Sequence, residues 1–230
     1  PDIRVHVIKR RHLWCYQLLL LFSPCFYVAF YEARRFKPIR GLCLHGEGMV
    51  KSEQYRRMQR AGIEVIPWQK IAPGERYSSA LWGSPVIVEP DYGREGLGVH
   101  LSKPENIEFE KTFTDGQCRL IQKFIESGEC PSYFRALSLF GEILYLRKTT
   151  NTASNIRIDS DVEFPNPVAN AANGRAELVY DADVIAFARD VAERAFPQIP
   201  LLGLDIIRDR ETGRLFCLEV NPYGSTWHFS

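Results

Sequence analysis

The sequence predicts a mixed α/β protein, because helical and extended patterns alternate along the chain and no internal repeat or low-complexity tract interrupts them. The 230 residues are 45% hydrophobic and 25% charged, which allows one large or two small domains with a buried core and excludes a disordered chain. The formal net charge is +1, and the basic residues are spread along the chain. Electrostatics therefore give no reason to expect nucleic acid as a partner.

The cysteines and the most apolar segment indicate the cellular compartment of the protein. The cysteines are scattered, with no CxxC pair and no Cys/His spacing suited to zinc, which favours a reduced intracellular compartment and packing roles. The apolar segment 13–31 is interrupted by Gln17, Ser23 and Pro24, so it predicts a buried strand or helix rather than a membrane span, which needs about 20 residues. No signal-peptide pattern is present, and we expect a cytoplasmic protein without a membrane partner.

In the first half of the chain, residues 4–9 have the pattern of a strand. Residues 51–60 combine good helix formers with apolar residues three apart, and Gly62 supplies a stop, so we predict a helix there. Residues 63–68 are expected to be extended. Residues 85–88 form a short β-branched run, which is typical of a buried strand.

A glycine-rich loop follows that strand directly, the form a chain takes when its backbone wraps phosphates; the glycines are Gly93, Gly96 and Gly98. The strand end and the loop also carry Glu89, Asp91 and Glu95 against a single Arg94. At ~4 Å and an effective dielectric of about 20, a like-charge contact costs ~4 kcal/mol. A phosphate cradle built with three carboxylates therefore needs an explanation.

The second half begins with an extended run at 119–125. Residues 134–139 and 143–147 flank Phe140-Gly141-Glu142 and predict a hairpin. The segment 149–174 is rich in Asn, Ser, Asp and Pro, so we expect a long loop.

Asp181 is placed to cap a helix that runs to about Phe196, with apolar residues on one face. The chain closes with a hairpin of residues 201–208 and 214–221 around the turn 209–213.

The closing hairpin predicts a cation site. A turn at 209–213 sets Asp205 roughly opposite Glu219, and the two-residue period of a strand puts Asn221 on the same face. Facing carboxylates in an otherwise apolar sheet destabilise it unless a cation bridges them, and oxygen ligands suit Mg²⁺ shared with substrate phosphates. The alternative is that Asp205 points into solvent and Glu219 pairs with an arginine.

Taken in order, these segments resemble the ATP-grasp superfamily, the fold of carboxylate-amine ligases such as the ribosomal-protein glutamate ligases and the D-alanine ligases. The matching segments are GMVKSEQYRRMQRAGIEVIP, PVIVEPDYGREGLGV, RLIQKFIE, FRALSLFGEILYLRK with the later SNI, and GLDIIRDRETGRLFCLEVNP. The ending LEVNPYGSTWHFS and the segment KPIRG resemble a bacterial branch of the superfamily whose members are uncharacterised. That branch leaves the substrates open.

The resemblance implies two α+β lobes that enclose a nucleotide cleft. Residues 49–121 would form the small lobe with the glycine-rich loop, and residues 122–230 the large lobe with the metal-ligand hairpin. Residues 1–48 form a short N-terminal segment to which the resemblance assigns no fold.

The resemblance also implies a site. ATP would contact the residues Lys51, Glu89, Gly93, Arg94, Gly96, Gly98, Gln122, Lys123, Phe124, Ile125 and Asn155, with the backbone of the hinge strand at 123–125 meeting the adenine edge. The catalytic residues would be Arg135 and Arg147, which hold the γ-phosphate or acyl phosphate, and Mg²⁺ would be bound by Asp205, Glu219 and Asn221. Read without the resemblance, the two arginines could be a solvated cross-strand pair and Lys51 an ordinary lysine at a helix start.

The end of the chain follows the ligand strand, so Tyr223, Trp227 and His228 are expected at the mouth of the site. The alternative for Trp227 is a place in the core.

Position 89 departs from the family, since the resemblance implies a lysine there that meets ATP phosphates and this chain has glutamate. In one interpretation Glu89 pairs with Lys51 or a nearby arginine, and ATP binding is retained. In the other, Glu89 repels nucleotide and the chain is a pseudoenzyme or an engineered variant.

The function implied is that of an ATP- and Mg²⁺-dependent ligase that forms a C–N bond between a carboxylate and an amine through an acyl phosphate. The partners would be small-molecule or peptide substrates. A nucleotide-binding regulator, a small-molecule kinase of the same fold and a pseudoenzyme are the alternatives.

Overall fold

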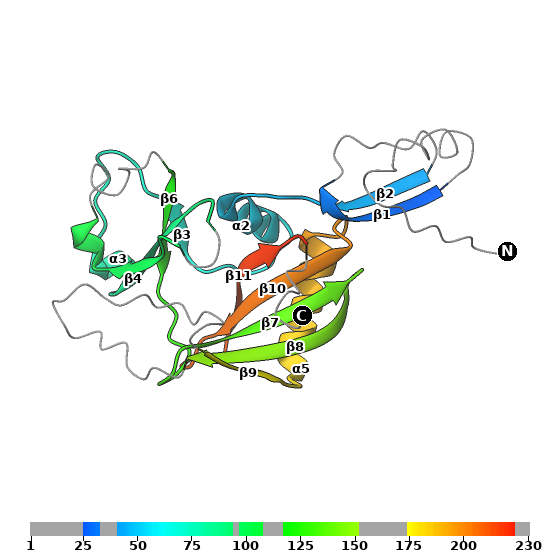
Figure 1. The fold of residues 1–230 in the computed structure, drawn as a ribbon. Coiled ribbons are helices and arrows are strands. Elements are labelled where there is room, and N and C mark those ends of the chain that lie inside the picture. The colour runs from blue at the N-terminus through cyan, green and yellow to red at the C-terminus, as the bar shows by residue number, and fades with distance from the viewer. Residues whose placement is uncertain (1–24, 33–40, 94–96, 108–116, 152–173, 224–230) are drawn as a thin grey trace.

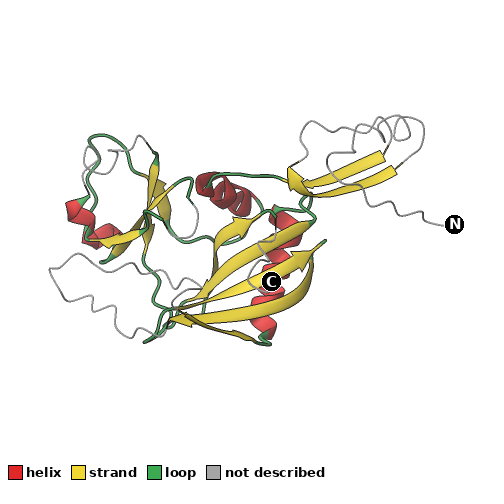
Figure 2. Cartoon of the chain, viewed as in Figure 1, coloured by secondary structure: helices red, strands yellow, loops and turns green. Residues whose placement is uncertain are grey.

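A computed structural model describes residues 25–32, 41–93, 97–107, 117–151 and 174–223, which form three β-sheets and their helices (Figures 1 and 2). The predicted mixed fold is confirmed, and the predicted strand at 4–9 lies outside the described residues. In chain order the elements are β1 (Cys25–Glu32), β2 (Gly41–Gly46), α2 (Lys51–Arg60), β3 (Trp68–Lys70), α3 (Ser79–Trp82), β4 (Val86–Pro90), β5 (His100–Ser102), η2 (Pro104–Asn106), β6 (Arg119–Lys123), β7 (Ser132–Leu139), β8 (Glu142–Asn151), β9 (Gly174–Leu178), α5 (Ala182–Asp190), η3 (Val191–Ala195), β10 (Leu201–Arg208) and β11 (Leu215–Asn221).

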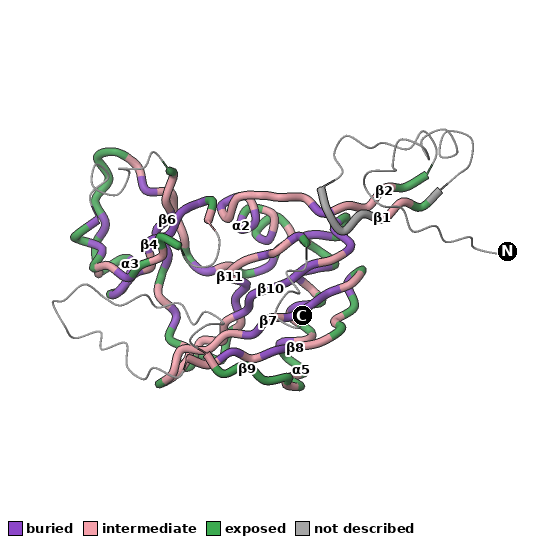
Figure 3. The backbone as a smooth tube through the Cα atoms, in the orientation of Figure 1, coloured by how far each residue is buried: buried purple, intermediate pink, exposed green. Residues whose placement is uncertain are grey.

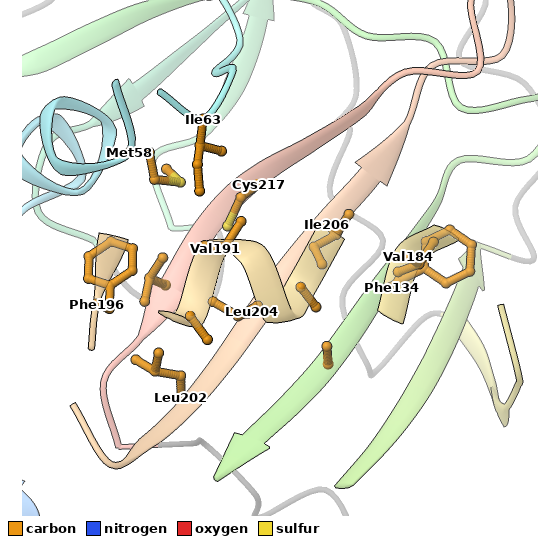
Figure 4. Packing of buried hydrophobic residues seen from close by; sticks show 14 of the residues in the cluster. Met58, Ile63, Phe134, Val184, Val191, Phe196, Leu202, Leu204, Ile206 and Cys217 are labelled. Carbon is orange, nitrogen blue, oxygen red and sulfur yellow. The ribbon is translucent and has the colours of Figure 1, made fainter. Parts of the chain in front are cut away.

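The largest sheet has the antiparallel order β11-β10-β7-β8-β9, and α5 with η3 covers one of its faces. The helix begins as predicted, because Asp181 Oδ1 accepts a hydrogen bond from Val184 N at 3.2 Å. Leu146, Ala136 and Leu204 follow one another across β8, β7 and β10 and are buried in the same cluster as Val184 and Ala188 of α5. Figure 4 shows Leu204 of this cluster beside the helix. This face of the sheet is therefore the core face.

A second antiparallel sheet has the order β3-β6-β4-β5 and its own apolar cluster. The short strand predicted at 85–88 is confirmed as β4, whose Val86 and Val88 are fully buried. The third sheet consists of β1 and β2, which pair in parallel within the segment to which the sequence assigned no fold.

Helix α2 has the predicted bounds, and Gly62 follows it with a positive φ of 70°, which favours glycine. In Figure 1, α2 lies between the two larger sheets, beside β11. Its Tyr55 and Met58 are buried in the same cluster as α5 and the largest sheet. The division of the chain into lobes at residue 121 stays a prediction. In the described part of the chain, the helices are too short or too polar to cross a membrane.

The elements that the sequence analysis missed are short or depend on distant partners. Of the residues 63–68 that were predicted to be extended, only Trp68 belongs to a strand, at the start of β3. Strand β8 continues into the predicted loop to Asn151, and β9 begins at Gly174, while residues 152–173 lie outside the described part. Most of β9 is exposed at the edge of its sheet (Figure 3), so it carries little apolar pattern.

Candidate functional site

Four charged residues form a row across the largest sheet. Arg147 of β8 pairs with Arg135 of β7, Arg135 with Asp205 of β10, and Asp205 with Glu219 of β11. Side chains alternate between the faces of a sheet, and the neighbouring row containing Leu204 packs in the core beside α5. The charged row therefore projects from the opposite face, and the predicted pairing of Asp205 with Glu219 is confirmed.

The centre of the row is an ion pair between Arg135 and Asp205. Arg135 Nη2 donates to Asp205 Oδ2 at 2.6 Å, and Arg135 Nε donates to Oδ1, so the contact is bidentate. The side chains are only 11% and 10% exposed. Burial disfavours the charged guanidinium, but Asp205 outweighs this and raises the pKa of Arg135. The alternative in which Asp205 points into solvent is wrong, and so is the alternative of a solvated Arg135.

The acidic end of the row collects three oxygen-bearing side chains. Asn221 Nδ2 lies 3.5 Å from Asp205 Oδ2. Burial raises the pKa of Glu219; Asp205 and Glu89 raise it further, whereas Lys51 and Arg135 lower it. The described residues contain no group of three or more His, Cys, Asp and Glu side chains that could hold a metal. The set here is two carboxylates and an amide, and this donor chemistry fits Mg²⁺ that keeps further oxygen ligands from water or phosphate.

Lys51, the first residue of α2, forms an ion pair with Glu89 at the end of β4. The two side chains are 13% and 6% exposed. Burial lowers the pKa of Lys51, but Glu89, Glu219 and Asp205 together raise it above its usual value. Lys51 is therefore not a solvated lysine at a helix start; it lies among three carboxylates. Of the two interpretations of Glu89, the structure agrees with the one in which Glu89 pairs with Lys51.

Asp91, the second acid of the loop, holds the start of α2. Its two carboxylate oxygens accept hydrogen bonds from Ser52 N and Ser52 Oγ, both at 2.8 Å. Lys70 Nζ lies 2.9 Å from Asp91 Oδ2. A carboxylate at a helix N-terminus satisfies free N–H groups and interacts favourably with the helix dipole. Two of the three acids that made the loop unusual thus bind the first turn of α2, and Glu95 lies outside the described residues.

Of the loop glycines, Gly98 needs to be glycine. Its φ is +76°, and a Cβ there would lie 2.9 Å from Pro90 Cγ. At Gly93 a Cβ would meet only ordinary contacts of 3.6 Å or more. The other two loop residues assigned to the nucleotide, Arg94 and Gly96, lie outside the described part of the chain.

Arg147 is the basic end of the row. It is only 4% exposed, and its Nε and Nη2 have no hydrogen-bond partner among the described residues. Buried donors are almost always paired, and an unpaired buried guanidinium is costly. Tyr145 lies two residues earlier on the same face, and burial raises its pKa while Arg147 and Arg135 lower it. Arg147 therefore offers donors to an anion in a protected position.

Strand β6 and the two residues after it contain the segment that the family resemblance assigns to the adenine, and most of their described contacts are to other parts of this chain. Gln122 is buried, and its Nε2 donates to the hydroxyl of Tyr55. Lys123 is exposed, and its backbone N–H donates to Pro67 O at 3.0 Å, so that N–H is already used within the chain. Phe124 is half-buried, and Ile125 is buried in a small cluster with Phe216 of β11.

The remaining predicted residues fall near the end of the chain or in its long loop. Tyr223 is described and packs against β2, since a Cβ at Gly46 would lie 2.6 Å from its ring. Asn155, Trp227 and His228 lie outside the described residues. The sequence analysis assigned no role to Ser52, Gln54 or Tyr55. The sequence feature that could have identified them is that they carry polar groups close to Lys51 on the side of α2 that is buried.

No protein-family model and no curated protein matches the sequence. Among solved structures, the chain is similar to the D-cycloserine synthetase DcsG, with a TM-score of 0.59, 16% identity, and coverage of 79% of this chain and 65% of that one. It is also similar to the D-alanine–D-alanine ligase from Bacillus anthracis complexed with ATP, with a TM-score of 0.56, 16% identity, and coverage of 79% and 60%. A third is the ATP-grasp ligase PsnB complexed with a minimal precursor, Mg and ADP, with a TM-score of 0.53, 14% identity, and coverage of 79% and 52%. This chain has the ATP-grasp fold and spans less than two thirds of the length of each of these proteins.

Proposed function

We propose that this chain binds ATP with Mg²⁺ and belongs to a ligase that joins a carboxylate to an amine through an acyl phosphate. The observation that carries the proposal is the charged row: carboxylates at one end, and at the other the buried Arg147, whose Nε and Nη2 have no partner among the described residues. A cation site beside an anion site is what a metal-bound phosphate requires. In this proposal residues 49–121 and 122–230 form the lobes of the cleft.

Each residue of the row has a separate role in the proposal. Asp205, Glu219 and Asn221 hold Mg²⁺, which when bound neutralises phosphate charge. Asp205 can serve both Mg²⁺ and Arg135, because a carboxylate has about four lone-pair sites and the bidentate contact uses two. Arg147 donates to the oxygens of the γ-phosphate. Arg135 keeps Asp205 in place and extends the positive surface toward the transferred group.

The reaction that this arrangement supports has two steps. An oxygen of the acid forms a bond to the γ-phosphorus as the bond to the bridging oxygen breaks, and ADP leaves. The amine then attacks the acyl carbon, and inorganic phosphate leaves with the electrons of the broken C–O bond and takes up the proton that the amine nitrogen loses. Arg147 and Arg135 stabilise the negative charge that develops on the phosphoryl oxygens, because they are fixed by the sheet before the reaction begins.

The three similar proteins favour small molecules or a peptide as the substrate class, since they are a D-cycloserine synthetase, a D-alanine–D-alanine ligase and a ligase complexed with a precursor. One observation favours a second candidate, a nucleotide-binding regulator without turnover. Lys51, which the family resemblance places at the nucleotide, is neutralised by Glu89. A ligase releases ADP quickly only when both an acid and an amine are present, and a regulator does not.

The proposal is tested by titrating ATP into the protein calorimetrically, with and without Mg²⁺, for the parent, Arg147→Met and Arg175→Met. Arg175 is an exposed arginine on the neighbouring strand β9 and serves as the matched control. We expect Arg147→Met to weaken Mg-ATP by about tenfold or more, the scale of a lost charge-assisted contact of about 1.5–3 kcal/mol. It should leave the stability of the fold unchanged or raise it, because it removes a buried guanidinium whose Nε and Nη2 bond to no described residue. A parent that does not bind Mg-ATP, or an Arg147→Met variant that binds it like Arg175→Met, overturns the proposal.

A further inference from the structure

Strand β11 is one of the two outer strands of the largest sheet, yet its outer edge is covered by α2. An edge strand leaves alternate N–H and C=O groups without a strand partner. Gln54 supplies partners to one residue of that edge: its Nε2 donates to Val220 O at 3.0 Å, and Val220 N donates to its Oε1 at 2.8 Å. The Gln54 side chain thus binds Val220 as another strand would. Both residues are buried.

Tyr55, the next residue of α2, binds the same edge two residues earlier. Its hydroxyl donates to Leu218 O at 2.8 Å. Leu218 is the extra residue of a β-bulge, because Asp205 pairs with Glu219 while Ile206 pairs with Cys217. A bulge redirects the side chains beside it and leaves its own residue out of the ladder. Glu219 therefore lies between two backbone positions that α2 holds.

The other residues of the first turn of α2 bind the end of β4 and the residue that follows it. Lys51 pairs with Glu89, and Ser52 donates twice to Asp91. One short stretch of helix thus connects the entrance of the glycine-rich loop with the strand that carries Glu219 and Asn221. No direct contact to a phosphate or cation is needed for such residues to influence the site.

We propose that Gln54 is a positioning residue for the carboxylate strand: by binding both backbone groups of Val220, it fixes the flanking Glu219 and Asn221 so that they share a cation with Asp205. The inference rests on the proposed function, since it concerns the cation of that site. Gln54 itself touches no proposed ligand. Groups that orient metal ligands typically change metal affinity about 10- to 100-fold when they are lost. A residue that only stabilises the fold would not change the dependence on Mg²⁺.

The test compares Gln54→Leu and Gln54→Glu with the parent and with Gln59→Leu. Gln54→Leu removes both hydrogen bonds at similar volume, whereas Gln54→Glu keeps an acceptor for Val220 N but loses the donor to Val220 O. Gln59 is an exposed glutamine of the same helix and is the matched control. Two quantities are measured: the affinity for ADP by calorimetry with and without Mg²⁺, and the free energy of unfolding in urea.

We expect Gln54→Leu to reduce the Mg²⁺-dependent gain in ADP affinity by about tenfold or more, while the affinity without Mg²⁺ changes far less. Gln54→Glu should lie between Gln54→Leu and the parent, and Gln59→Leu should match the parent. If Gln54→Leu does not fold, the Mg²⁺-dependent gain in ADP affinity is compared between Gln54→Glu and the parent instead. A normal Mg²⁺ dependence in the folded Gln54 variants, together with lower stability, overturns the positioning role alone. A parent whose ADP affinity does not respond to Mg²⁺ overturns the proposed function, and the inference with it.

Discussion

The ion pair between Lys51 and Glu89 gives the most discriminating perturbation, Glu89→Gln. The change keeps the size of the side chain and leaves Lys51 as a buried cation that has lost its contact partner, with the two side chains 13% and 6% exposed. Removing one partner of a buried ion pair typically costs about 3–5 kcal/mol. We expect the low end, about 3 kcal/mol, because Glu219 and Asp205 still favour the charged Lys51. Urea unfolding of the nucleotide-free protein measures this loss.

The same change should have the opposite effect on nucleotide. Glu89 lies beside Lys51, so in the proposed site it repels the phosphates and occupies the lysine that could bind them. A like-charge contact at ~4 Å and an effective dielectric of about 20 amounts to ~4 kcal/mol. A third of that value, about 1.4 kcal/mol, already corresponds to a tenfold change in affinity. Glu89→Gln should therefore bind ATP at least about tenfold more tightly, as measured by calorimetry at a temperature where both proteins are folded.

Glu64→Gln is the control for a glutamate whose ion pair with Arg214 is half-exposed. It should cost less than about 1 kcal/mol and leave ATP affinity unchanged. Glu89→Lys should be less stable than Glu89→Gln, since it sets two buried cations side by side. Equal or weaker ATP binding in folded Glu89→Gln would refute the location of Glu89 at the phosphates. Unchanged stability would refute the energetic importance of the ion pair.

Two further predictions follow from the burial of individual groups. Asp205→Asn should lower the free energy of unfolding by about 3 kcal/mol because it breaks the buried contact with Arg135, whereas Glu219→Gln should be as stable as the parent. Both variants should lose Mg²⁺-dependent nucleotide binding. A parent-like response to Mg²⁺ in either variant would contradict the assignment of that residue as a Mg²⁺ ligand. Burial raises the pKa of the Cys217 thiol far above neutral, so at pH 8 iodoacetamide should leave Cys217 unmodified in the native protein while it labels the half-buried Cys118 and Cys130. Mass spectrometry of the digested protein reads this out, and rapid native labelling of Cys217 would show that the cluster around it opens readily.

The parts of the site that the sequence predicted are those fixed by local patterns. Helix α2 was predicted with its bounds because helix formers and a terminal glycine lie in one continuous segment. Asp205 was predicted opposite Glu219 because both belong to one hairpin and the turn sets their register. The contact between Arg135 and Asp205 joins two different hairpins, and such pairing depends on the order of strands in the sheet, which no local pattern carries.

The contacts of α2 were missed for a related reason. Gln54 looks like an ordinary polar residue of a helix and Tyr55 like a residue of its apolar face, and their importance comes from the edge of β11, more than 160 residues later in the chain. The carboxylates of the loop were noticed and Lys51 was named as one possible partner of Glu89, but the structure was needed to choose that partner and to show that Asp91 caps α2. A sequence pattern can show that a residue type is unusual at its position, whereas its partner has to come from the fold.

The ion pair at Glu89 also determines the charge of the proposed site. The cations Lys51, Arg135 and Arg147 are balanced by the carboxylates Glu89, Asp205 and Glu219, so these six described groups together are neutral. A lysine at position 89, which the family resemblance implies, would instead give this set an excess of positive charge. A neutral site has little attraction for free nucleotide, and Mg²⁺ both reduces the negative charge of the phosphates and engages the carboxylates. The same charge balance separates two of the variants. Glu89→Gln changes the charge of the site, so nucleotide should bind more readily without Mg²⁺. Gln54→Leu changes only the position of the Mg²⁺ ligands, so added Mg²⁺ should increase nucleotide affinity less than it does in the parent.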